Sequence, residues 1–144
     1  MQEQFSFDTL VSIGPYLFIG ALLASLIPAA VSKWLMSLIF GHSVSFMLIL
    51  IVSTLTVLIS VFVLFWLGLL GPQIDNWDMP LGPSLLLTVA SYLLQATMLT
   101  LFAPDADGDF VPLWKWLVVL VAQYVLYVLI SILLGMLFFM AAIA

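Results

Sequence analysis

The spacing of the charged residues constrains this chain more than any other feature of its sequence. Nine Asp, Glu and Lys residues divide the 144 residues into four long uncharged segments of 24, 41, 26 and 29 residues: 9–32, 34–74, 79–104 and 116–144. A bilayer core about 30 Å thick needs roughly 20 apolar helical residues, so each segment can hold one spanning helix. The second segment is interrupted by Gly41, His42 and Ser43, which leaves too little chain on the near side for a further span. The sequence therefore predicts an all-α integral membrane protein with four spans.

The composition supports this class and excludes others. Hydrophobic residues make up 66% of the chain and charged residues 6%, with a mean hydropathy of +1.37, whereas an average soluble domain has about 45–50% and 25%. Too few polar side chains remain to cover a compact domain in water, and the chain is far too apolar to be disordered. Cysteine is absent, which excludes disulfides, thiolate metal sites and cysteine nucleophiles. Because the N-terminus lacks the basic region and cleavage site of a signal peptide, we expect the first span to be retained.

The helix signals place the spans within one domain, 1–144, as a four-helix bundle with short loops. The expected spans are about 10–30, 45–70, 84–102 and 113–143. The second span ends before Gly71-Pro72, because proline cannot continue a helix without losing a hydrogen bond. Segment 31–40 mixes Ser, Lys and Trp with large apolar residues, which predicts either a short interfacial helix or an extension of the first span. The fourth span, about 46 Å long, must tilt or project from the hydrocarbon.

Tryptophan and lysine positions predict the orientation. Tryptophan collects at membrane faces, and Trp66 and Trp77 fall beside loop 71–83. The other three fall beside loops 31–43 and 103–112, on the opposite side: Trp34, Trp114 and Trp116. Both lysines also lie on that side, so the positive-inside rule predicts cytoplasmic loops 31–43 and 103–112, with both termini outside. The plasma (inner) membrane is the expected location.

Residues for catalysis or for cofactor binding are scarce, so we expect no enzyme, no cofactor and no metal site. His42 is the only histidine and is interpreted as a turn residue at the membrane surface, because no nucleophile or orienting group accompanies it. With two basic residues, a nucleic-acid partner is not expected either. The run 105–109 resembles the start of a calcium loop, but Gly108 is fourth and Trp116 twelfth, where such a loop needs Gly sixth and Glu twelfth. The remaining interpretations are a solvated turn, or a docking loop for a basic partner carried by Asp105, Asp107 and Asp109.

Polar residues within the expected spans are neutral and recur at helical spacing. They form stripes on the second span (Ser45, Ser53, Thr56, Ser60), the third (Ser84, Thr88, Ser91, Gln95) and the fourth (Gln123, Tyr127, Ser131, Gly135). The first span carries two adjacent rows of small residues, Gly20 with Ala24 and Ala21 with Ser25 and Ala29. Small residues let helices approach closely, so we expect Gly20, Ala24 and Gly135 to serve helix packing. Counting depth from the 103–112 loop predicts a contact set of Tyr92, Gln95 and Gln123, made directly or through water, with further interhelical polar contacts at Tyr127 and Ser131.

Two function hypotheses follow from these stripes. If the stripes face one another as packing surfaces, the protein is a small non-catalytic subunit or accessory of a homo- or hetero-oligomeric membrane complex, acting as scaffold, stabiliser or sensor. If some stripes line a hydrated passage, it is a minimal oligomeric channel or carrier for a neutral or small solute, because Ser, Thr and Gln can replace water around such a molecule. The expected partners are the lipid bilayer and either further copies of the chain or other membrane proteins.

Overall fold

A computed structural model describes residues 7–66 and 81–144, which fold into four α-helices. They are α1 (Phe7–Phe40), α2 (Phe46–Trp66), α3 (Leu81–Phe102) and α4 (Leu113–Ile143). Each contains a segment long and apolar enough to cross a membrane. The predicted all-helical chain with four such helices is confirmed. The predicted end of the second span at 67–70 and the loop that contains Trp77 lie outside the described residues.

Segment 31–40 forms the last ten residues of α1 and is not a separate interfacial helix. Pro28 lies inside α1 and cannot donate a backbone hydrogen bond, yet the helix continues past it. The turns that follow bury Ser32, Leu35 and Met36. Burial of this face stabilises the continued helix and offsets the missing bond.

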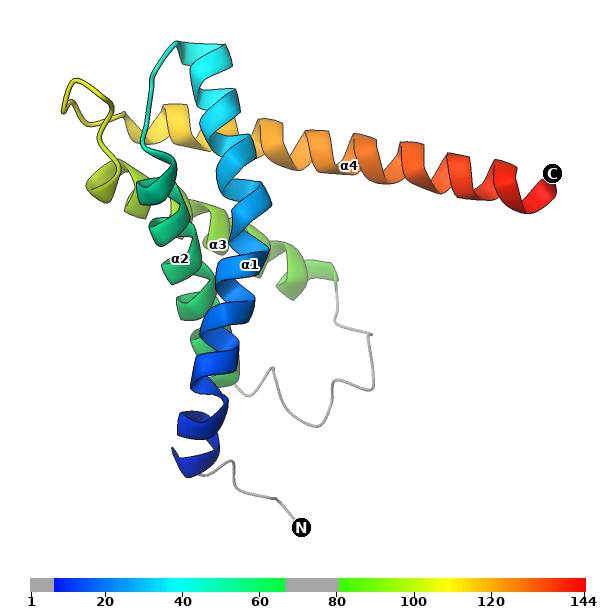
Figure 1. Ribbon diagram of the computed structural model, residues 1–144, viewed down its shortest axis with the longest axis horizontal. Helices are drawn as coiled ribbons and strands as arrows, with labels where there is room; N and C mark the ends of the chain where they lie inside the picture. Colours follow the sequence, from blue (N-terminus) through cyan, green and yellow to red (C-terminus); the bar gives the residue numbers. More distant parts are fainter. Residues whose placement is uncertain (1–6, 67–80) are drawn as a thin grey trace.

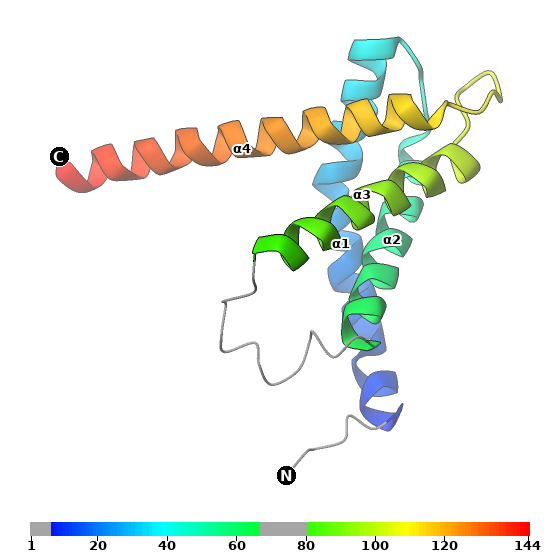
Figure 2. The ribbon, with the colours of Figure 1, turned by 180° about the vertical axis from the view of Figure 1, so that it is seen from behind.

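The helices form two pairs that meet at one end. Each helix contacts two others, through the pairs α1·α2, α2·α3, α3·α4 and α4·α1. Figure 1 and Figure 2 show α1 and α2 running side by side, while α3 and α4 leave their common end in a different direction. The largest fully buried side chains come from all four helices: Met36, Ile49, Leu99, Leu120 and Trp116. These residues belong to one apolar core that joins the two pairs.

The two connections at this end contact each other. Val44 in the α1–α2 connection forms an isolated antiparallel bridge with Asp105 in the α3–α4 connection, and the Ala106 N–H donates to the Ser43 carbonyl at 2.7 Å. Gly41 and Gly108 have φ of 69° and 85°, a left-handed backbone that favours glycine in both turns. The structure therefore places the α1–α2 and α3–α4 connections at the same end of the molecule.

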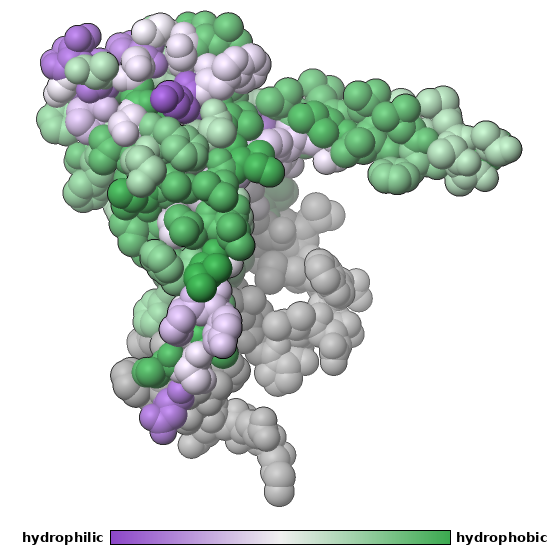
Figure 3. Space-filling view, viewed as in Figure 1, coloured by the Kyte–Doolittle hydropathy of each residue, from purple (hydrophilic) through white to green (hydrophobic). Residues whose placement is uncertain are grey.

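Hydrophilic residues are confined to the ends of the molecule in the face shown in Figure 3. They gather where the two connections lie and at the N-terminal end of α1, with an apolar surface between them. The second half of α4 projects from this body as an apolar rod (Figure 1). Every residue from 128 to 144 is exposed. This half of α4 therefore has no packing partner within the described chain.

Candidate functional site: a polar cleft between the helix pairs

An open hollow lies between α2 and α3, with α1 and α4 behind it. It is an open cleft of about 630 Å³. Both views of the ribbon show α2 and α3 moving apart with distance from the end where the connections meet. Neutral polar residues from all four helices line it: Ser25, Ser53, Thr56, Ser60, Thr88, Ser91, Tyr92, Gln95, Gln123 and Tyr127. Three of the four stripe residues of the second span and of the third, and two of the four of the fourth, thus converge on one cleft.

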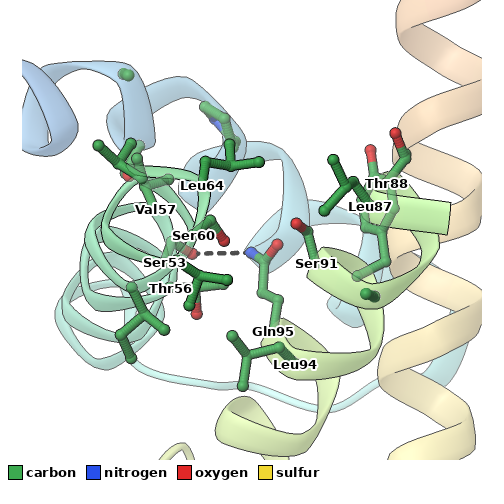
Figure 4. Close-up of a pocket in the computed structure, with 18 of the residues that line it drawn as sticks. Ser53, Thr56, Val57, Ser60, Leu64, Leu87, Thr88, Ser91, Leu94 and Gln95 are labelled. Carbon is green, nitrogen blue, oxygen red and sulfur yellow. Dashed lines mark hydrogen bonds between the residues drawn. The ribbon is translucent and has the colours of Figure 1, made fainter. Parts of the chain in front are cut away.

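Gln95 lies at the centre of the α2–α3 side of the cleft. Its Nε2 atom donates a hydrogen bond to Ser53 Oγ at 3.1 Å across the two helices. Figure 4 shows the hydroxyl groups of Ser60 on α2 and Ser91 on α3 pointing toward the same amide. Neither of these two hydroxyls makes a hydrogen bond to the described residues. The cleft therefore offers hydrogen-bonding groups that residues 7–66 and 81–144 leave unused.

Gln123 forms the link between α4 and α1. The Ser32 hydroxyl donates to Gln123 Oε1 at 2.6 Å, and Gln123 Nε2 donates to the Tyr127 hydroxyl at 3.0 Å. Ser32 is fully buried and Gln123 is 4% exposed. Both polar ends of the Gln123 amide are thus satisfied inside the protein, as a buried amide requires.

The structure shows no direct hydrogen bond within the predicted contact set of Tyr92, Gln95 and Gln123. All three line the cleft, but no hydrogen bond joins them, since Gln95 bonds α2 and Gln123 bonds α1. Tyr92 instead meets Tyr124 of α4 edge to face, with ring centroids 6.3 Å apart. The serines of α1 and α2 supply the partners that the sequence argument assigned to neighbouring residues of α3 and α4.

The structure separates the predicted small residues into two groups. Ala21, Ser25 and Ala29 are buried in the helix contacts of α1. A Cβ atom on Gly20 or Gly135 would meet no atom of another helix within 4 Å. Ala24 is exposed and lines the cleft, and Ser131 is exposed beyond it on α4. Packing within the described chain therefore uses the row that contains Ser25, and not Gly20, Ala24 or Gly135.

Sequence reasoning missed two features of α1. The rows of small residues on the first span were followed only to Ala29, so the role of Ser32 was missed. Ser25, Ala29 and Ser32 lie on one helical face. Pro28 has no N–H, so the Ala24 carbonyl four residues earlier lacks its usual helical donor. Pro28 and Ala24 both line the cleft.

The acidic loop is largely a self-contained turn. Asp105 Oδ1 accepts the backbone N–H groups of Asp109 at 2.9 Å and Asp107 at 3.0 Å. These bonds, first the one from Asp109, lower the pKa of the Asp105 carboxyl, and the nearby His42 lowers it further. The Asp105 side chain is 8% exposed, whereas Asp107 and Asp109 are exposed. Of the three aspartates in the predicted docking loop, only Asp107 and Asp109 have exposed side chains that a partner could contact.

The cleft is electrically neutral. None of its described lining residues is Asp, Glu, Lys, Arg or His. A charged ligand would lose its hydration there without gaining a counter-charge, which is costly in an apolar surrounding. Among residues 7–66 and 81–144, no group of three or more His, Asp or Glu lies close enough to hold a metal ion. The chemistry available in the cleft is hydrogen bonding and apolar contact.

Fold and cleft together define a small helical protein with four helices of membrane-spanning length around a neutral polar hollow. Comparison with protein-family models, curated proteins and solved structures finds no match to the chain.

Proposed function

We propose that the protein binds a small, uncharged, hydrogen-bonding molecule in the cleft and acts as a minimal carrier or channel subunit for it. The observation that carries this proposal is the convergence of neutral polar side chains from all four helices on one open cleft. The hydroxyl groups of Ser60 and Ser91 point into it and make no hydrogen bond within the described part of the chain (Figure 4).

The depth of these groups makes an occupant with polar atoms necessary. Gln95 lies seven residues from the end of α3 at Phe102, or about 10 Å along the helix. At such depth, lipid tails offer no hydrogen bonds, and a polar group that faces them loses several kcal/mol. Water, a polar solute or a partner's side chain must therefore occupy the cleft.

The size of the cleft is that of a site for a small molecule. Such sites usually measure about 300–1,000 Å³, and this cleft measures about 630 Å³. The neutral lining further favours alcohols, amides and water over ions.

Osmotic swelling of proteoliposomes tests this proposal. Vesicles that contain the protein should take up glycerol or urea faster than protein-free vesicles. Ser91→Ala and Gln95→Leu should slow this uptake, because they remove hydrogen-bonding groups from the cleft. Ser131→Ala is the matched control, since Ser131 is exposed on α4 outside the cleft. Uptake equal to that of protein-free vesicles, or equal slowing by Ser131→Ala, would contradict the proposal.

A second candidate function is that of a non-catalytic subunit of a membrane complex. It is favoured by the second half of α4, where all residues from 128 to 144 are exposed over about 25 Å. Another membrane protein or a second copy would bury this surface. Native mass measurement in mild detergent tests it: a defined oligomer or a co-purified protein is expected, and a pure monomer would count against it.

A further inference from the structure

We propose that His42, Asp105 and Lys115 form a pH-operated clasp that controls how far the two helix pairs separate around the cleft. This inference rests on the proposed function, because it concerns the regulation of the same site. The observation behind it is independent, since none of the three residues lines the cleft.

The clasp joins three segments at the closed end of the molecule. His42 belongs to the α1–α2 connection, Asp105 to the α3–α4 connection and Lys115 to the first turn of α4. His42 Nδ1 lies 3.3 Å from Asp105 Oδ2, and its Nε2 lies 2.6 Å from Lys115 Nζ. The His42 side chain is 27% exposed, so protons from solvent can reach it. One imidazole ring thus bridges the two helix pairs.

This geometry requires a neutral imidazole with a defined tautomer. The lysine ammonium has donors only, so Nε2 of His42 must accept its hydrogen bond through an unprotonated lone pair. The single ring proton then lies on Nδ1, from which it is donated to the Asp105 carboxylate. Protonation of Nε2 would set two cationic donors against each other, and the bond to Lys115 would be lost.

His42 contributes the imidazole of the clasp. Histidine is the side chain that ordinarily changes charge between pH 5 and 8. Asp105 remains ionised in this range, because the N–H groups of Asp109 and Asp107 lower its pKa. The charged groups that face His42 in the described structure are Asp105 and Lys115, and the nearby part of α1 contributes the uncharged ring of Phe40. Acidification therefore keeps the contact between His42 and Asp105 and breaks the hydrogen bond between His42 and Lys115.

Release of Lys115 frees the start of α4 from the α1–α2 connection. The backbone contacts of Val44 with Asp105 do not involve the imidazole and remain. Lys115 keeps only its position beside the rings of Phe40 and Trp114, at 5.4 and 5.7 Å. Because Gln123, two turns further along α4, lines the cleft, movement of α4 changes the cleft itself.

Nitrogen NMR of histidine-labelled protein provides the first test. His42 is the only histidine of the chain, so its ring nitrogens give unambiguous signals. At pH 8 we expect the form protonated on Nδ1 and unprotonated on Nε2. Observation of the opposite tautomer would overturn the clasp.

Distances between spin labels provide the second test. The chain has no cysteine, so labels can be attached to cysteines placed at the exposed positions Phe62 on α2 and Leu86 on α3. The distance between the two labels should shift when the pH falls from 8 to 5.5. In His42→Gln it should stay constant, because a glutamine amide can donate to Asp105 and accept from Lys115 without titrating. Lys115→Met should give at pH 8 the distance that the parent reaches at pH 5.5.

The two proposals fail in different ways in these experiments. A parent distance that does not change with pH, or one that changes equally in His42→Gln, overturns the clasp whatever the vesicles take up. A pH-dependent distance without any solute uptake supports the clasp and contradicts the proposed transport. Where uptake occurs, its rate should change severalfold between pH 8 and 5.5 in the parent and less than twofold in His42→Gln.

Discussion

Replacement of Gln123 by leucine tests how α4 is held to α1. The substitution removes the hydrogen bond from Ser32 and the bond to Tyr127. Interhelical hydrogen bonds in membrane proteins contribute about 0.6 kcal/mol on average and about 1.7 kcal/mol at most. Loss of both bonds should therefore lower the free energy of unfolding by about 1–3 kcal/mol. Ser32→Ala removes one bond and leaves Gln123 Oε1 buried without a donor, at a cost of about 1–2 kcal/mol.

A double-mutant cycle separates this bond from general packing effects. Ser32→Ala combined with Gln123→Leu should cost less than the sum of the single changes, by about 0.6–1.7 kcal/mol, because the shared bond is counted twice in that sum. The cycle of Gln95→Leu with Gln123→Leu is the control. These two residues share no hydrogen-bond partner, so their effects should add within about 0.5 kcal/mol.

Reversible unfolding in detergent micelles, followed by near-UV circular dichroism, measures both cycles. Additive effects in the Ser32 and Gln123 cycle would refute the α1–α4 bond. A coupling above about 0.5 kcal/mol between Gln95 and Gln123 would instead support the direct contact expected from the sequence.

Three further predictions concern the connections. Asp105→Asn should destabilise the fold, whereas Asp107→Asn with Asp109→Asn should leave the unfolding midpoint unchanged, because only Asp105 bonds to the rest of the molecule. Because folding lowers the pKa of Asp105, the ionised carboxylate contributes to the free energy of unfolding at pH values above the unfolded-state pKa of about 4. This contribution to stability disappears as the pH falls through the lower folded-state pKa. When the free energy of unfolding is measured against pH, Asp105→Asn should lack this acid-dependent loss of stability. In intact cells, an impermeant thiol reagent should label cysteine at Asn76 but not at Ser37 or Asp107, and the opposite pattern would invert the orientation.

The helices could be predicted from the sequence because their ends are fixed by local chemistry. Pro104 follows α3 and Pro112 precedes α4, and the observed ends at Phe102 and Leu113 agree with the expected ones. The end of α1 could not be fixed in the same way, because the sequence left 31–40 as either an interfacial helix or an extension of the first span. The structure shows the extension, in which Ser32 and Met36 are buried. Tertiary packing decides there what local signals leave open.

The site could be predicted only as a set of faces. Helical spacing assigned Thr56, Ser60, Ser91, Gln95 and Gln123 to polar stripes, and all five line the cleft. Spacing along one helix, however, does not determine how that helix is rotated against its neighbours. The partners Ser53 for Gln95 and Ser32 for Gln123 depend on that rotation. For the same reason, no feature of the sequence predicted that His42 would meet Lys115.

The lengths of α1 and α4 give a physical reason for the cleft. At 34 and 31 residues they measure about 51 and 46 Å. Both are longer than a hydrocarbon core of about 30 Å, so each must tilt or project from it. The two helices belong to different pairs, and the pairs lean in different directions from their shared end (Figure 2). Opposite tilts fit both long helices into one bilayer and separate α2 from α3 at the other end. The helix faces that this separation exposes carry serine, threonine and glutamine. A hydrated site needs such polar side chains, whereas a dry contact between helices does not.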